Sequence, residues 1–175
     1  MKALLFSVLI SMSASQVARI DEAGSKRMME LMPVIYKVAD RHALPAWVIA
    51  GIIYNESNAH HAIKGDGGRA WGLGQIHCGP KGFSWLNFLK QRGIISSCKE
   101  LLVGANSVAA IGEILSYLRV KEMKKRKLEW YNVTTSYHKG EAWRRNKLGV
   151  AKSYYGNVQY FGQYFQFMTL EGDNG

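Results

Sequence analysis

Apolar side chains recur at every third or fourth position through much of this chain, a spacing typical of amphipathic helices. The clearest example is the segment 107–118, with apolar residues at Val108, Ile111, Ile114, Leu115 and Leu118. The same spacing predicts three further helices, over residues 34–43, 45–57 and 83–92. No convincing strand pattern occurs between residues 31 and 158. The sequence therefore predicts an all-α, or mainly α, protein.

Prolines and glycines predict where these helices begin and end. We expect Pro33 to open the helix over 34–43, and Leu44-Pro45 to separate that helix from the next one. Residues 58–69 are expected to form a loop, because they contain Gly65-Asp66-Gly67-Gly68. Aromatic residues are dense over 154–167, and we expect this stripe to pack in the core.

Glu56 is the first candidate for chemistry. It follows Ile49, Ile52 and Ile53 at spacings of three and four, so all four residues share one helix face. Burial disfavours a charged carboxylate, and the nearby end of the helix carries a partial negative charge that acts in the same direction. A glutamate that keeps its proton near neutral pH suits a general acid for glycosidic cleavage. The alternative is an ordinary solvated glutamate at a helix end.

The composition indicates one globular domain that is attracted to polyanions. The chain has 175 residues and a net charge of +10, which suits nucleic acid, anionic lipid or bacterial cell wall. Residues 119–147 hold ten Lys and Arg against three Glu, either as a solvated surface or as a docking surface for an anionic wall or membrane. The chain has no RNA-binding signature and no zinc-ligand spacing, so we expect no specific nucleic acid partner and no metal.

The ends of the chain and its two cysteines bear on localisation. Residues 1–18 combine Lys2, an apolar run over 3–10 and small residues, as a short secretory signal does. The alternative is an N-terminal helix that anchors to the domain or to a partner. In an exported protein, Cys78 and Cys98 would form one disulfide, whereas in the cytosol they would be buried thiols. We expect the domain to span 19–170, with a flexible tail over 171–175.

Several short motifs resemble those of the soluble lytic transglycosylase family. Glu56-Ser57, followed sixteen residues later by Gly72-Leu73-Gly74-Gln75-Ile76, is similar to the family's E-S and G-L-M-Q-I, with Gly74 in place of methionine. Residues 101–108 resemble the family's L-F-D-P-x-x-N-I segment in part, with Val103-Gly104 in place of Asp-Pro. The segment 137–140 resembles Y-N-x-G, with a histidine in the asparagine position.

This resemblance implies a lysozyme-like fold and a set of site residues. The catalytic residues would be Glu56 and Tyr137, with the Tyr137 hydroxyl hydrogen-bonded to the Glu56 carboxyl. Gln75 would line a saccharide groove and hydrogen-bond the substrate. The full set of substrate-binding residues would be Ser57, Gly72, Leu73, Gln75 and His138. No cofactor is required.

The implied reaction is cleavage of the β-1,4 bond between N-acetylmuramic acid and N-acetylglucosamine in peptidoglycan, with a 1,6-anhydro product. One alternative is a hydrolytic muramidase of the same fold, with Asp66 as a second carboxylate. Another is a structural component of a secretion system, pilus or phage tail that binds the wall. The implied location is the periplasm or the cell wall, or else a phage virion.

Overall fold

The described part of the chain is mainly helical. The structure, a computed structural model, describes residues 20–79, 83–123, 130–139 and 148–172. This helical content confirms the predicted class at the level of mainly α. The helices are α3 (Glu22–Arg41), α4 (Ala46–Ser57), α5 (Leu86–Gln91), α6 (Gly104–Met123), α7 (Trp130–Lys139) and α8 (Leu148–Gly172).

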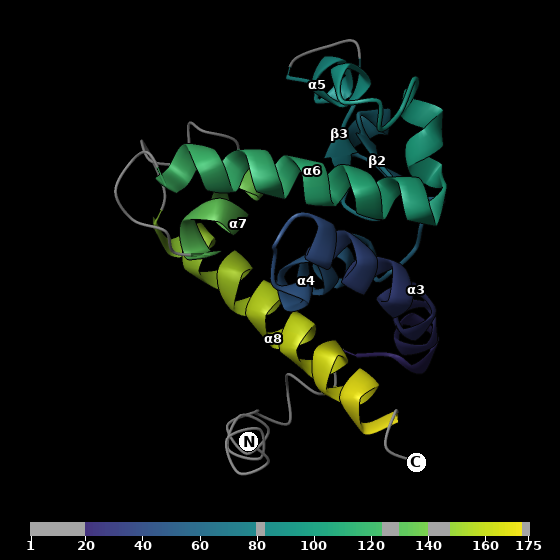
Figure 1. The fold of residues 1–175 in the computed structure, drawn as a ribbon, viewed down its shortest axis with the longest axis vertical. Coiled ribbons are helices and arrows are strands. Elements are labelled where there is room, and N and C mark those ends of the chain that lie inside the picture. Colours follow the sequence, from purple (N-terminus) through teal and green to yellow (C-terminus); the bar gives the residue numbers. More distant parts are fainter. Residues whose placement is uncertain (1–19, 80–82, 124–129, 140–147, 173–175) are drawn as a thin grey trace.

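Helix α4 lies at the centre of the fold, between α6 and α8 (Figure 1). Its sequence is apolar on nearly all sides, which is typical of a helix surrounded by protein. Val48, Ile49, Ile52 and Ile53 are all fully buried. The long helix α8 crosses α4 and contributes Phe161 and Phe165, whose rings each lie 4.8 Å from the ring of Tyr54. This contact confirms that much of the aromatic stripe belongs to the core.

Helix α3 begins earlier than the sequence predicted. Asp21 caps its N-terminus by accepting a 2.6 Å hydrogen bond from the backbone N–H of Gly24, and the helix then runs through Pro33. Pro33 is exposed, whereas Met28, Met32 and Ile35 on the opposite side are fully buried. The prediction that Pro33 opens the helix was wrong, because burial of this apolar face offsets the backbone hydrogen bond that proline cannot make.

The expected loop over 58–69 contains part of a small sheet that the sequence did not reveal. Strands β1 (Lys64–Gly65), β2 (Ala70–Trp71) and β3 (Ile76–His77) pair antiparallel in the order β1-β2-β3. Lys64 lies opposite Trp71, and Trp71 lies opposite Ile76. A short 3₁₀ helix, η1 (Asp66–Gly68), joins the first two strands. Strands of two residues are too short to show an alternating pattern.

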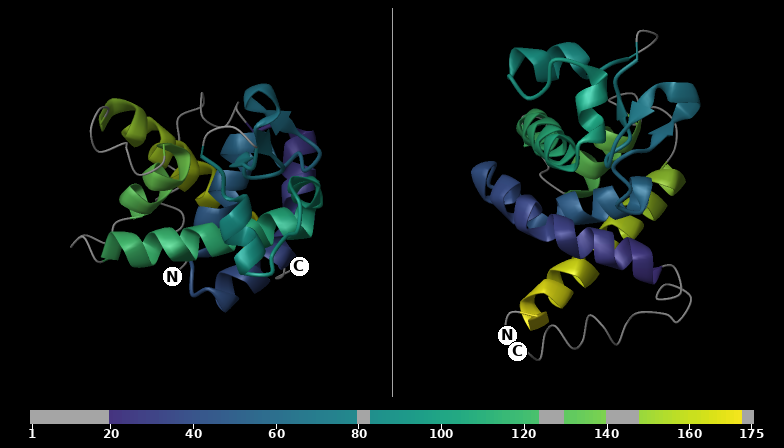
Figure 2. Two further views of the ribbon diagram at one scale, coloured as in Figure 1. Left: turned by 90° about the horizontal axis from the view of Figure 1, so that it is seen from above. Right: turned by 90° about the vertical axis from the view of Figure 1, so that its right-hand side faces the viewer.

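A second 3₁₀ helix, η2 (Cys98–Leu102), precedes α6 and is joined to the end of the sheet. Cys98 pairs with Cys78 at disulfide distance, with 5.6 Å between their Cα atoms, which is the bridged alternative of the two considered for these cysteines. Figure 2 shows the sheet and α5 at one end of the molecule and the C-terminal half of α8 at the other. The disulfide therefore stabilises the end of the molecule that carries the sheet.

The C-terminal boundary of the domain differs from the expected one. Helix α8 continues to Gly172, so the first part of the expected tail over 171–175 is helical. The expected signal over 1–18, and residues 124–129 and 140–147 of the basic segment over 119–147, lie outside the described residues. Within the described ranges, no helix combines the length and apolar character needed to cross a membrane.

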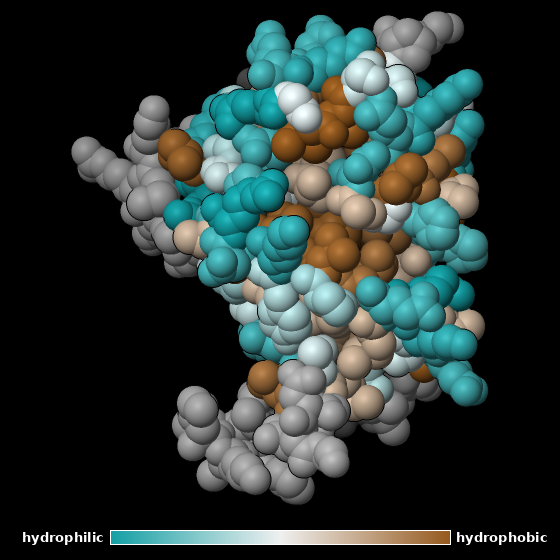
Figure 3. Space-filling view, turned by 45° about the vertical axis from the view of Figure 1, so that its right-hand side comes forward, coloured by the Kyte–Doolittle hydropathy of each residue, from teal (hydrophilic) through white to brown (hydrophobic). Residues whose placement is uncertain are grey.

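The face drawn in Figure 3 gathers hydrophobic side chains at its centre, with hydrophilic ones around them.

Candidate functional site

The C-terminal end of α4 holds Glu56 at the edge of the apolar interior. The helix ends at Asn58, which adopts a left-handed conformation (φ 51°, ψ 39°) and donates its backbone N–H to the carbonyl of Tyr54. Ile53 is fully buried one turn earlier, while the side chain of Glu56 is 17% exposed. The sequence spacing therefore predicted the position of this carboxylate correctly.

Two side chains from other helices approach the same oxygen of Glu56. The hydroxyl of Tyr154, on α8, donates a 2.7 Å hydrogen bond to Oε1 of Glu56. Nδ1 of His138, on α7, lies 3.6 Å from that oxygen. The rings of His138 and Tyr154 stack on each other, with centroids 4.1 Å apart and planes 13° apart. Glu56 thus accepts a hydrogen bond from the Tyr154 hydroxyl and lies beside the His138 imidazole, and these two rings fix each other's position by stacking.

Burial is the main reason that the pKa of Tyr154 lies well above its ordinary value, and the neighbouring Glu56 carboxylate raises this pKa further. The phenol therefore remains protonated throughout the physiological range. It can donate to Glu56 at every stage of a reaction in which the carboxyl group loses and regains a proton.

Tyr137 occupies the cavity but does not hydrogen-bond Glu56. Its hydroxyl donates to the carbonyl oxygen of Gly74 at 2.9 Å. Burial, and then the charge of Glu56, raise the pKa of Tyr137 well above its ordinary value, so the two groups are electrostatic neighbours. The prediction that Tyr137 hydrogen-bonds Glu56 was wrong. The Tyr137 hydroxyl donates to the carbonyl of Gly74 instead, and the hydroxyl that donates to the Glu56 carboxyl is that of Tyr154.

The turn over residues 72–75 is shaped by close packing. Gly72 has a φ of +70°, and an added Cβ would collide with the carbonyl of Leu101. The backbone N–H of Leu73 donates to Oγ of Ser107 at 3.0 Å, which ties the turn to α6. At Gly74, a Cβ would overlap the Tyr137 hydroxyl and the side chain of Ile111. A side chain at this position would therefore have to displace the Tyr137 hydroxyl and the side chain of Ile111.

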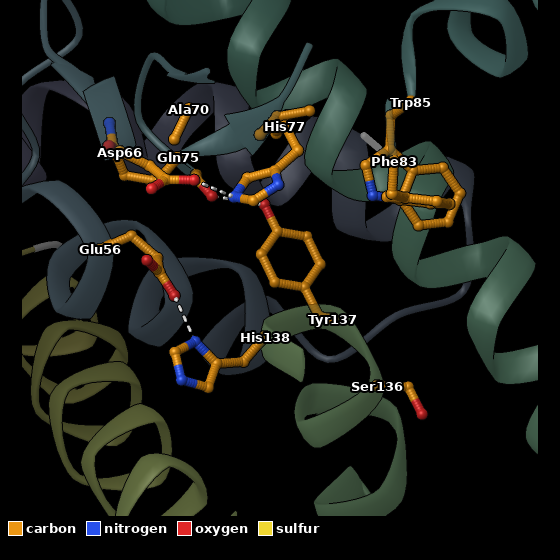
Figure 4. Close-up of a pocket in the computed structure, with 12 residues that line it drawn as sticks. Glu56, Asp66, Ala70, Gln75, His77, Phe83, Trp85, Ser136, Tyr137 and His138 are labelled. Carbon is orange, nitrogen blue, oxygen red and sulfur yellow. Dashed lines mark hydrogen bonds and ion pairs between the residues drawn. The ribbon is translucent and has the colours of Figure 1, made fainter. Parts of the chain in front are cut away.

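A cavity of about 630 Å³ opens beside these groups (Figure 4). Glu56 and His138 face each other on one side of it, while Asp66, Gln75 and His77 come from the sheet region. Phe83 and Trp85 form an aromatic wall, with ring centroids 5.0 Å apart and their planes nearly perpendicular. Its complete lining is Glu56, Asp66, Ala70, Gly74, Gln75, Ile76, His77, Phe83, Trp85, Ser136, Tyr137 and His138.

Asp66 is the second carboxylate in this lining. Its Oδ1 accepts a 2.6 Å hydrogen bond from Arg69, and its Oδ2 lies 3.5 Å from Nε2 of His77. The Asp66 side chain is 40% exposed, compared with 17% for Glu56. The cavity therefore combines a sheltered carboxyl group with a solvated one that has basic partners, an arrangement suited to acid–base chemistry on a polar ligand.

Four of the predicted site residues meet at the cavity, and three do not. Glu56, Gln75, Tyr137 and His138 belong to its lining. Ser57 is buried and donates its hydroxyl to the carbonyl of Ile53 at 3.0 Å. Gly72 is buried as well, and Leu73 is fully buried in the core. Ser57, Gly72 and Leu73 thus pack in the helix end and the turn outside the cavity lining, and the substrate contacts expected for them stay predictions.

The sequence alone did not identify Tyr154 as a site residue. It stands in a stripe of aromatic residues, and the stripe as a whole packs in the core, so nothing local distinguishes it. The roles of His77 and Phe83 were also missed, because both depend on where the sheet and the residues before α5 lie in the tertiary structure. Trp85 lines the cavity as well.

Neither a metal-ligand cluster nor a known relative identifies the site further. Among the described residues, no three His, Cys, Asp or Glu side chains cluster closely enough to hold a metal ion. A comparison of this chain with known family models and with curated protein sequences finds no match.

Proposed function

We propose that this chain is a peptidoglycan lytic transglycosylase with a lysozyme-like domain. The observation that carries the proposal is the setting of Glu56, a sheltered carboxyl group in a cavity of about 630 Å³ and hydrogen-bonded by the Tyr154 hydroxyl. The motif resemblance around Glu56, Gln75 and Tyr137 supports the same conclusion. Aromatic walls such as Phe83 and Trp85 suit the apolar faces of sugar rings.

In the proposed reaction, Glu56 serves first as acid and then as base. Its proton passes to the glycosidic oxygen as the bond from C1 of N-acetylmuramic acid to that oxygen breaks. The carboxylate then takes the proton of the C6 hydroxyl while O6 bonds to C1, which gives the 1,6-anhydro product and restores the carboxyl group. Because the attacking hydroxyl belongs to the substrate, no water and no second protein carboxylate are needed.

A hydrolytic muramidase is the second candidate, and Asp66 is the observation that favours it. Asp66 lines the same cavity as Glu56, so it could serve as the second carboxylate of a hydrolase. Its partners Arg69 and His77 occupy both of its oxygens, which favours a binding role for Asp66. We therefore place hydrolysis second.

The proposed substrate implies a location and a partner. Peptidoglycan strands lie outside the cytoplasmic membrane, so we propose that the chain acts in the periplasm or at the wall, or is carried in a virion. The net charge of +10 suits the anionic wall. A secretion system, pilus or phage tail would use such an enzyme to open the wall locally.

The test is digestion of purified sacculi, followed by mass spectrometry of the released muropeptides. Wild type should release anhydro-muropeptides, and Glu56→Gln should reduce this release by at least about 1,000-fold, because the amide cannot donate the proton. Glu30→Gln is the matched control, since Glu30 is an exposed glutamate on α3 away from the cavity. Its activity should equal that of wild type.

Two other outcomes would contradict the proposal. Reducing muropeptides, about 18 Da heavier because water is retained, would show hydrolysis, and Asp66→Asn would then be expected to abolish it. Folded wild type that binds sacculi without cleaving them would indicate a structural wall-binding component.

A further inference from the structure

His138 is the residue at which the site departs from the motif it resembles. The resembling family has asparagine in this position, and asparagine carries no charge. Here an imidazole stacks on Tyr154 and places Nδ1 3.6 Å from Oε1 of Glu56. Its side chain is 28% exposed, so it can exchange protons with solvent. The hydroxyl of Tyr154 contacts the same oxygen, so three groups meet at one point.

The described elements around His138 contribute other titratable groups. Helix α4 contributes Glu56, α8 contributes Tyr154, and α7 itself contributes Tyr137, whose hydroxyl points to Gly74. Across the cavity, Asp66 is paired with Arg69 and His77. Among the described residues of the cavity lining, Glu56 is therefore the carboxylate at ion-pair distance from His138.

We propose that His138 is a positioning residue that sets the pH range of cleavage, through an ion pair with Glu56 that competes with the protonated, acid form of Glu56. This inference rests on the proposed function. A histidine ordinarily gains its charge between pH 5 and 8. In that range, one proton shared by the pair can reside on Glu56, which permits cleavage, or on His138, which creates the ion pair and prevents cleavage.

The competition between these two protonated forms predicts the direction in which the alkaline limb of the pH profile moves when His138 is replaced. As the pH rises, wild type loses the proton of Glu56 earlier than a variant with a neutral side chain at position 138. His138→Asn should therefore move the alkaline limb of the kcat/KM profile about one pH unit higher, since an opposite charge within 4–6 Å changes proton affinity by a factor of ten or more. The two profiles should converge at alkaline pH, where His138 is neutral.

The matched control is His77→Asn, which removes the other histidine of the cavity lining. His77 is paired with Asp66, so this variant can change the rate but should leave the position of the limb where it is in wild type. A role for His138 in folding alone would scale the whole profile of His138→Asn without moving the limb. An unmoved limb would overturn the proposal.

A second measurement does not depend on activity. The imidazole signal of His138 is followed by NMR between pH 4 and 9, and it is assigned by its absence from His138→Asn. In Glu56→Gln, the titration midpoint of this signal should fall about one pH unit below that of wild type, because the paired charge is gone. An identical midpoint in both proteins would show that the ion pair does not form and would overturn the proposal.

The two measurements also separate this inference from the proposed function. If wild type cleaves no sacculi at any pH but the midpoint falls in Glu56→Gln, the ion pair stands and the proposed transglycosylase activity is wrong. If wild type cleaves normally and the midpoint is unchanged, the activity stands and the role of His138 is wrong.

Discussion

At the residue scale, two tyrosine hydroxyls hydrogen-bond different parts of the site. Tyr154 donates to Glu56 on α4, and Tyr137 donates to the carbonyl of Gly74 in the turn. Both hydroxyls keep their protons, because burial and the Glu56 charge raise the pKa of each tyrosine. Two similar residues thus act differently: one orients the carboxyl group and the other positions the turn that carries Gln75.

Asp21 acts at the same scale, although it lies outside the cavity. Its carboxylate accepts hydrogen bonds from the backbone N–H of Gly24 and from the side chain of Asn58, the residue that ends α4 next to Glu56. The Gly24 bond, then the Asn58 bond, lower the pKa of Asp21 in the folded protein. A single exposed carboxylate thereby joins the start of α3 to the end of α4.

We predict that this cap contributes stability that depends on pH. Because the folded-state pKa is depressed, the contribution is complete above the unfolded pKa of about 4 and is lost as the pH falls through the folded value. Asp21→Ala should lower the free energy of unfolding by about 1 kcal/mol at pH 7 and by less at pH 3. Urea denaturation at both pH values measures this difference.

Asp21→Asn is the control for the charge, because asparagine caps helices well but does not titrate. Its stability relative to Asp21→Ala should not vary between pH 7 and pH 3. A difference between wild type and Asp21→Ala that is the same at both pH values would show that the carboxylate charge has no role.

At the element scale, the geometry of the site depends on how closely α4 and α8 cross. Two glycines allow the helices to approach closely: a Cβ on Gly51 would collide with the carbonyl of Val158, and a Cβ on Gly162 would collide with that of Trp47. Backbone atoms cannot turn aside as a flexible side chain can. Glu56 and Tyr154 lie on these two helices, so their hydrogen bond depends on this spacing.

Gly51→Ala should therefore separate α4 from α8, reducing the free energy of unfolding by about 2 kcal/mol or more. Gly156→Ala is the matched control, since Gly156 is an exposed glycine in α8 with open space around its Cα. This control should raise stability by about 0.5–1 kcal/mol through helix propensity. Denaturant unfolding of both variants tests the prediction, and equal destabilisation by the two would contradict it.

At the scale of the whole molecule, the helices and the sheet region depend on different stabilising contacts. The helices share an apolar core that includes Met32, Ile53 and Phe165. The sheet region has strands of only two residues, and its connection to η2 is reinforced by the pairing of Cys78 with Cys98. The cavity lies between these regions, so its shape depends on both.

Loss of the disulfide should weaken the whole fold. The bridge joins residues 20 positions apart, and a loop of that size corresponds to about 3 kcal/mol in the chain-entropy account. Replacing both cysteines by serine should lower the free energy of unfolding by about that amount under oxidising conditions. Reduced wild type should match the variant, whereas no difference between oxidised wild type and the variant would show that the bridge adds no stability.

The sequence by itself determined α4, α6 and the position of Glu56, since these follow from the spacing of apolar residues along one segment. Only the tertiary structure decided the partners of Glu56, because Tyr154 is 98 residues away and looks like any other residue of an aromatic core stripe. Likewise, Pro33 predicted the start of a helix from local geometry, but α3 runs through it because burial of the apolar face of α3 outweighs the lost hydrogen bond. Local signals follow from covalent geometry and periodicity, whereas the site depends on which helix faces meet.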